Sequence, residues 1–175
     1  MTDFQALWDL ALPYDAFLAA SDLKHRGLWE GLHRLARIPD WALAAVPVDA
    51  GRRLLVLAED WCGDASNTIP VLARLADSAP GVELRILRRD EHPEVMDRYL
   101  TNGARSIPIV IALDREFNEL GHWGPRPRAL QTWVMAERAR GVPKEELYPS
   151  VRKWYARDHG ETTLREVLET ARLAA

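Results

Sequence analysis

Two short apolar runs separated by a segment with helical spacing constrain the fold of this chain more than any other feature. Residues 53–58 (RLLVLA) form a continuous apolar run with a turn on each side, which is typical of a buried strand. Residues 63–78 carry apolar side chains at helical spacing, and residues 82–87 alternate in polarity as a second strand does. Strands that are joined through a helix pair in parallel, so these segments predict a parallel sheet covered by helices.

The segments that follow add an antiparallel pair to this sheet. Residues 107–113 (IPIVIAL) are the strongest expected strand, and together with residues 117–123 they predict a hairpin, followed by a helix at 128–140. The predicted fold class is therefore α/β, with a mixed central sheet flanked by helices. The sheet should hold four strands, or five if the N-terminal region contributes one.

Helical patterns on both sides of this region predict extra N- and C-terminal helices. The expected organisation is one domain in three parts: an N-terminal helical extension at 1–50, a core at 51–141, and a C-terminal helical extension at 142–175 packed on the core. Trp29, Trp133 and Trp154 fall on apolar helix stripes, which predicts that all three pack inward between the extensions and the sheet.

Charge and cysteine content exclude several classes of protein. The 175 residues hold 23 basic and 26 acidic side chains, and a net charge of −3 argues against wrapping nucleic acid or binding a membrane through a polybasic patch. Neither a run of about 20 apolar residues nor a basic leader is present, so we expect a soluble, cytoplasmic protein. A single cysteine cannot form an internal disulfide or a multi-cysteine metal site.

That cysteine, Cys62, falls between the first expected strand and its helix, in the segment EDWCGDA. The free backbone N–H groups of a helix start stabilise a thiolate and lower the thiol pKa. The carboxylates of Glu59, Asp60 and Asp64 would oppose this effect if they lie close, so the sequence leaves the sign of the net shift open. A cysteine at a helix start is expected to be exposed, and exposure favours reactivity.

Here the chain resembles the thioredoxin family. Trp-Cys-Gly after a buried strand is similar to the family's Trp-Cys-Gly-Pro-Cys turn, and other pieces follow in the family's order: Pro70 in the helix, Asp90 to Pro93 after the next strand, the loop at 102–108, Gly121 and Gly124. The resemblance covers roughly residues 50–140. It implies a thioredoxin-like fold, an active-site turn of Trp61, Cys62, Gly63, Asp64 and Ala65, and Cys62 as the nucleophile.

The resemblance also assigns a role to the proline loop. In this family the loop lies against the cysteine and its proline is cis, which implies a cis Ile107–Pro108 bond here. Ile107 would offer its backbone to an extended peptide or to glutathione, as in strand addition. From the residues alone, Pro108 could equally mark the start of a strand.

Three departures from the family pattern limit the chemistry. Ala65 replaces the second cysteine, Asp64 replaces the proline between the cysteines, and Val56 replaces the buried aspartate. The set Trp-Cys-Gly-Asp-Ala resembles a bacterial thioredoxin-like subgroup. Because the resolving thiol is absent, an external thiol would have to release any adduct formed on Cys62.

The leading functional hypothesis is a single-cysteine thiol–disulfide oxidoreductase. Its partners would be a protein disulfide or a glutathione mixed disulfide, with glutathione as the candidate co-substrate and no bound cofactor. The alternative is a redox-inactive thioredoxin-like binding scaffold, and a thiol pKa well below that of free cysteine would favour the first over the second. Peroxide reduction fits less well, because Glu59 stands where related peroxidatic sites carry threonine.

Two further interpretations concern residues outside the turn. Cys62, Asp64 and His122 lack metal-ligand spacing, so no metal site is predicted. We interpret Arg126 and Arg128 as solvated residues at the start of the next helix, with binding of a glutathione carboxylate as the alternative.

Overall fold

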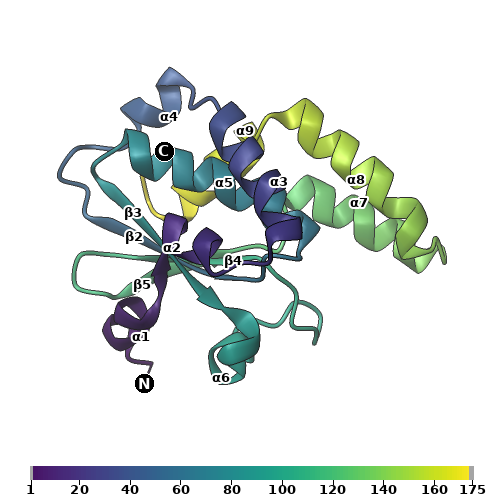
Figure 1. The fold of residues 1–175 in the computed structure, drawn as a ribbon, viewed down its shortest axis with the longest axis horizontal. Helices are drawn as coiled ribbons and strands as arrows, with labels where there is room; N and C mark the ends of the chain where they lie inside the picture. The colour runs from purple at the N-terminus through teal and green to yellow at the C-terminus, as the bar shows by residue number, and fades with distance from the viewer. Residues whose placement is uncertain (1, 174–175) are drawn as a thin grey trace.

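The computed structural model describes residues 2–173 and places a mixed β-sheet at the centre of the molecule (Figure 1). In these residues the sheet has five strands in the order β1-β3-β2-β4-β5. The strands are β1 (Leu12–Pro13), β2 (Arg52–Ala58), β3 (Val82–Arg88), β4 (Ile109–Leu113) and β5 (Glu119–Trp123). The expected parallel pair is β2 with β3, and the expected hairpin is β4 with β5. The N-terminal region contributes the fifth strand, since β1 pairs antiparallel with β3.

Strands β2 and β4 form the middle of the sheet and carry its most apolar stretches. Leu54 pairs with Leu84 across the parallel ladder, and Leu55 pairs with Ile111 across the antiparallel one. Residues 54–58 and all of β4 are buried. A strand covered on both faces reads as a continuous apolar run, which is why these two segments show no alternation.

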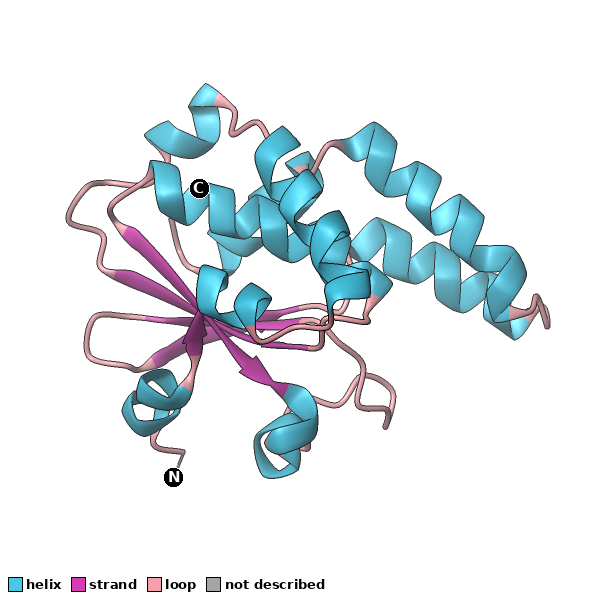
Figure 2. Cartoon of the chain, in the orientation of Figure 1, coloured by secondary structure: helices cyan, strands magenta, loops and turns pink. Residues whose placement is uncertain are grey.

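Helices cover both faces of the sheet (Figure 2). The N-terminal helices are α1 (Phe4–Leu10), α2 (Tyr14–Ala19), α3 (Leu23–Leu35) and α4 (Asp40–Ala44). The others are α5 (Gly63–Ser78), the short η1 (Arg89–Glu91), α6 (Pro93–Met96), α7 (Arg128–Ala139), α8 (Lys144–Asp158) and α9 (Glu161–Thr170). Helices α3, α4, α5 and α9 lie on one side of the sheet, whereas α1 and α6 lie on the other (Figure 1). No helix among the described residues is long and apolar enough to span a bilayer.

Helices α7 and α8 form an antiparallel pair, here named the α7–α8 hairpin, that projects away from the sheet (Figure 1). The pair has a small buried cluster of its own, made of Leu130, Val134, Val151 and Tyr155, with Trp154 packed against it. Helix α9 then returns to the sheet, where it contacts β4 and β5.

The projection of this hairpin makes one prediction about tryptophan wrong. Trp29 is fully buried, as expected, and Trp154 is half-buried in the small cluster. Trp133, in contrast, is 38 % exposed. The stripe on α7 correctly indicates a helix, but Trp133 lines an open pocket with residues of α8 and does not pack between the helices and the sheet.

Candidate functional site

Cys62 occupies the N-cap position of α5, directly after the turn that follows β2. Its side chain is buried at 9 % exposure, so the expectation of an exposed thiol is wrong. The Sγ atom donates a hydrogen bond to the carbonyl oxygen of Ile107 at 3.5 Å. The thiol therefore lies against the loop at 102–108, and the structure brings together the two segments that the sequence singled out.

The proline loop has a tightly packed underside. The Ile107–Pro108 peptide bond is cis, and Pro108 is buried. Gly124 lies beneath it with a φ of +126°, and a Cβ at that position would come within 2.1 Å of the Pro108 carbonyl oxygen. Only glycine fits there, because both the backbone conformation and the space exclude a side chain.

Burial controls the electrostatics of the thiol. Removal from water raises the pKa of Cys62, and the negative charge of Asp64 raises it further. The backbone N–H groups of Ala65 and Asp64 and the cation of Arg126 act in the opposite direction, and the net pKa is above that of an ordinary thiol. The helix start thus has the effect predicted from the sequence, but desolvation outweighs it.

Of the three carboxylates near Cys62 in sequence, Glu59 and Asp60 are directed to other parts of the fold. Glu59 pairs with Arg88 at 3.2 Å and accepts a hydrogen bond from the Asp90 backbone N–H at 2.9 Å. Asp60 accepts from the Asp22 backbone N–H at 2.8 Å, which ties the start of α3 to the active-site turn. Asp64 is therefore the carboxylate that acts on the thiol.

Asp64 forms a polar cluster that sequence analysis missed. Its side chain is 4 % exposed and makes two contacts with Arg126, from Nε to Oδ1 at 2.9 Å and from Nη2 to Oδ2 at 2.7 Å. The Tyr155 hydroxyl donates to the same Oδ1 at 2.8 Å, and burial beside this carboxylate raises the pKa of Tyr155. The two contacts with the guanidinium and the hydrogen bond from the hydroxyl together compensate the buried charge of Asp64.

This cluster corrects the interpretation of the two arginines. The Arg126 side chain is only 18 % exposed and lies before α7 rather than in its first turn. Arg128 is 73 % exposed and pairs with Glu166 and Glu169, as a solvated first-turn residue does. The pattern HWGPRPR shows two arginines at similar positions, and nothing local distinguishes the one that faces Asp64.

A cleft of about 300 Å³ opens beside Cys62, between the active-site turn, the proline loop and the α7–α8 hairpin. Trp61, Cys62, Asp64 and Ile107 line it. Trp61 is 51 % exposed, with the guanidinium carbon of Arg89 5.1 Å from the centre of its ring. Gly63 and Ala65 begin α5, where Ala65 is fully buried. Helix α8 passes close to the turn, since a Cβ at Gly63 would lie 3.9 Å from the Tyr148 ring.

The charge of this cleft is strongly one-sided. Its basic lining residues are Arg89, Arg105, Arg126, Arg138 and Lys144, against the single acid Asp64. Arg126 compensates Asp64, and Arg89 and Arg105 pair with aspartates outside the cleft lining. Arg138 and Lys144 have no carboxylate within 4.0 Å among residues 2–173. An anionic group that entered the cleft would meet both of these cations without displacing an ion pair.

His122 lies away from this site, stacked edge-on against Tyr99 at 4.9 Å between ring centres. Within residues 2–173, no three histidine, cysteine, aspartate or glutamate side chains gather as metal ligands would. The side chains that contact Asp64, next to Cys62, are those of an arginine and a tyrosine.

A cysteine at the N-cap of a helix, set against a proline loop on a mixed sheet of this strand order, defines an α/β protein of thioredoxin-like class. The family model described as thioredoxin matches residues 11–140. The chain belongs to the thioredoxin family.

Two solved structures share the fold. An HIV epitope-scaffold matches with a TM-score of 0.77 and 22 % identity, over 99 % of this chain and 100 % of its own. A Pseudomonas aeruginosa protein of unknown function matches with a TM-score of 0.77 and 23 % identity, over 100 % of both chains. No curated protein matches the sequence.

Proposed function

We propose that this protein is a single-cysteine thiol–disulfide oxidoreductase with Cys62 as its nucleophile. One observation carries the proposal: the thiol lies beside the Ile107 carbonyl in the lining of a basic cleft. Ile107 precedes β4, whose ladder with β2 begins at Ile109. We infer that its backbone pairs with an extended substrate, in the manner of strand addition.

The proposed reaction has two exchange steps. The Cys62 thiolate attacks the glutathione sulfur of a protein–glutathione mixed disulfide, so that a Cys62–glutathione disulfide forms and the protein thiolate leaves. A second glutathione then attacks this disulfide, which frees Cys62 and releases oxidised glutathione. Across both steps, one reduced glutathione and the mixed disulfide give the reduced protein thiol and one oxidised glutathione, and the second step supplies the resolving thiol that Ala65 cannot.

The basic cleft supports glutathione as the co-substrate. Glutathione has a carboxylate at each end, and Arg138 and Lys144 are the cleft cations without carboxylate partners among the described residues. The reaction requires a supply of reduced thiol, so we place the protein in a reducing cytoplasm. The Trp-Cys-Gly-Asp-Ala turn further suggests the bacterial subgroup noted above.

Incubation with oxidised glutathione, followed by intact mass measurement, tests this function. A single glutathionyl adduct should form on the wild type and disappear with dithiothreitol, and Cys62→Ser should form none. Because the thiol pKa is raised, the reaction must be followed near neutral pH and well above it. No adduct at either pH would overturn the proposal.

The redox-inactive scaffold stays as a second candidate because the raised pKa of Cys62 favours it. Little thiolate is present at neutral pH when burial raises the thiol pKa, and structural cysteines are commonly buried and inert. The scaffold would use the same cleft to hold a partner without exchange. Full function of Cys62→Ser in cells would support the scaffold and exclude the oxidoreductase.

A further inference from the structure

A second pocket lies in the α7–α8 hairpin and shares no lining residue with the Cys62 cleft. Its volume is about 600 Å³, within the range of small-molecule sites. Its lining residues are Trp133 from α7 with Ser150, Lys153, Trp154, Arg157 and Asp158 from α8. The α8 residues recur at the three- and four-residue spacing of one helix face, so the pocket follows that face over two turns.

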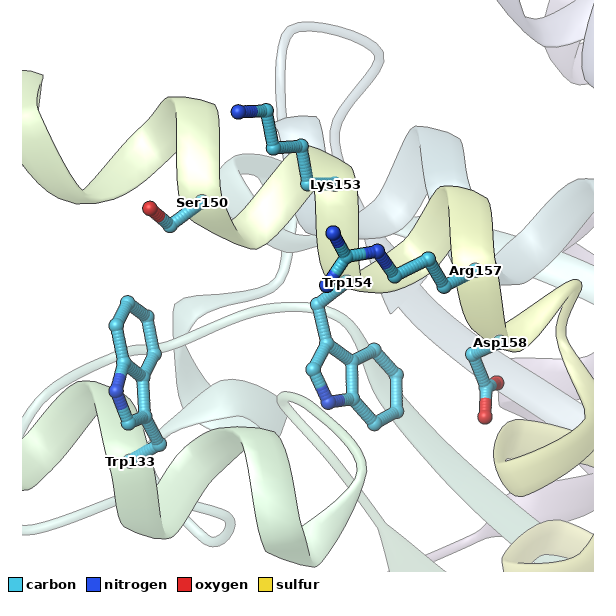
Figure 3. Close-up of a pocket in the computed structure, with 6 residues that line it drawn as sticks. All are labelled: Trp133, Ser150, Lys153, Trp154, Arg157 and Asp158. Carbon is cyan, nitrogen blue, oxygen red and sulfur yellow. The ribbon is translucent and has the colours of Figure 1, made fainter.

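Two indole rings form the apolar part of this pocket. Figure 3 shows Trp133 rising from α7 and Trp154 extending from α8 into the gap between the helices, with an opening between the rings. Trp154 rests against the small buried cluster, whereas Trp133 belongs to no buried cluster of the described residues and is 38 % exposed. Rings placed in this way offer flat apolar surface to a group inserted between them.

The polar part of the pocket has an unbalanced positive charge. Lys153 and Arg157 are four residues apart on α8, and neither has a carboxylate within 4.0 Å among residues 2–173. The acid of the pocket, Asp158, is already engaged, since it accepts hydrogen bonds from the backbone N–H and the hydroxyl of Thr162 at the start of α9. With the two cations Lys153 and Arg157 against this one carboxylate, the rim attracts an anion.

We propose that this pocket binds a small amphiphilic anion, an aryl or alkyl group that carries a carboxylate or sulfonate. The apolar part would lie between Trp133 and Trp154, and the anionic group would face Lys153 and Arg157. Apolar surface together with a few placed charges is the usual composition of a small-molecule site. The inference is independent of the thiol chemistry, because it uses no residue of the Cys62 cleft.

Anilinonaphthalene sulfonate is a suitable probe, because it joins an aryl group to an anion and becomes fluorescent in apolar surroundings. The folded wild type should bind it at one saturable site and quench tryptophan fluorescence in parallel. N-phenylnaphthylamine, the same ring system without the sulfonate, should bind at least about tenfold more weakly, since one charge-assisted contact contributes on that order.

Variants assign the binding to this pocket. Trp133→Ala should weaken the sulfonate about tenfold, and Arg157→Glu about fivefold or more, with little loss of stability because both side chains are exposed. Arg152→Glu, on the same helix but outside the pocket, should bind as the wild type does. Arg138→Glu, in the Cys62 cleft, should also leave binding unchanged.

Three results would overturn the proposal. Equal affinity for the charged and the neutral ring would remove the role of the cations. Binding that is unaffected by Trp133→Ala, or abolished by Arg138→Glu, would place the ligand elsewhere. Absence of any saturable site would leave the groove as a surface for a protein segment rather than for a small molecule.

Discussion

The sheet with its covering helices and the α7–α8 hairpin are built on different principles. In the sheet, β2 and β4 are buried along most of their length and belong to one large apolar cluster that also includes α5 and α9. In the hairpin the buried cluster has four residues, and several exposed side chains are basic. Burial of apolar area stabilises the first region, and the second has little of it.

Near Cys62, the contact between the sheet region and the α7–α8 hairpin is made by polar side chains. Asp64 comes from α5, Arg126 from the segment before α7, and Tyr155 from α8. Asp64, two residues after Cys62, joins the other two side chains, and both Asp64 and Arg126 line the cleft. The comparison indicates that most of the apolar burial lies in the sheet, whereas a polar seam of Asp64, Arg126 and Tyr155 joins the two regions and sets the surroundings of Cys62.

Truncation of a leucine in each region tests this division most strongly. Leu57→Ala, near the end of β2, should lower the free energy of unfolding by about 3 kcal/mol, since truncation of a fully buried side chain leaves a cavity. Leu130→Ala, in the hairpin cluster, should instead open α7 and α8 locally. Urea unfolding and hydrogen exchange measure both effects. Loss of exchange protection in β2 and β4 with Leu130→Ala would contradict the division.

Removal of Arg126 tests the polar seam. Arg126→Ala leaves the 4 % exposed Asp64 carboxylate without its cation and should cost about 3 kcal/mol of stability, as breaking a buried pair does. The pKa of Cys62 should rise further, because the Arg126 cation lowers it. Urea unfolding and the rate of alkylation by iodoacetamide report the two changes. Arg128→Ala is the comparison variant: it should cost much less stability, because Glu166 keeps hydrogen bonds from the Trp123 indole and the residue 128 backbone, and it should leave the alkylation rate unchanged.

The pH dependence of Cys62 tests whether burial or the helix start controls the thiol. The folded pKa is raised, so the stability contributed by the protonated thiol is complete below the ordinary thiol pKa and is lost as the pH rises through the folded value. Alkylation should be slow at neutral pH and increase about tenfold per pH unit into the alkaline range. Cys62→Ser should show a smaller alkaline loss of stability than the wild type. Alkylation at neutral pH faster than that of free cysteine would show that the helix start prevails.

Charge reversal at Arg138, which lines the cleft from the α7–α8 hairpin, gives the smallest expected change in the reaction rate of Cys62. Arg138→Glu should slow the reaction of Cys62 with oxidised glutathione about three- to fivefold, in line with a solvent-exposed charge contact. The difference from the wild type should shrink at high salt. Stopped-flow or quenched mass measurements at two salt concentrations check this, and Arg152→Glu, at an exposed position of α8 outside the cleft lining, serves as control. An equal slowing by both variants would assign the effect to net charge alone.

The sheet could be predicted from the sequence because burial on both faces leaves continuous apolar runs at β2 and β4. The pairing directions followed from the lengths of the connections, a helix in one case and a short turn in the other. The two residues of β1 carry no such signal: they have no periodicity, and one of them is Pro13. The exposure of Trp133 could not be predicted either, because an apolar stripe on a helix does not show what packs against it.

For the site, the position of Cys62 at a helix start and its nearness to the loop at 102–108 followed from the resemblance. The Asp64 cluster did not, since Arg126 and Tyr155 lie 62 and 91 residues further along the chain. The thiol's exposure was wrongly expected for a similar reason, because residues far along the chain also surround Cys62. Val134, Leu147 and Val151 of the hairpin line the cleft beside Cys62, and no local pattern shows that they come to rest there.

The distance in sequence between Asp64 and Tyr155 also has a consequence in time. Ribosomes add about 5–20 residues per second, so Cys62 and Asp64 emerge several seconds before Tyr155 does. During that interval the nascent chain has neither the hydroxyl of Tyr155 nor, at first, the guanidinium of Arg126 to accompany the Asp64 carboxylate. The thiol's environment therefore matures late in synthesis, and a chain that stalls before α7 would present Cys62 to cellular oxidants without the helices that line its cleft.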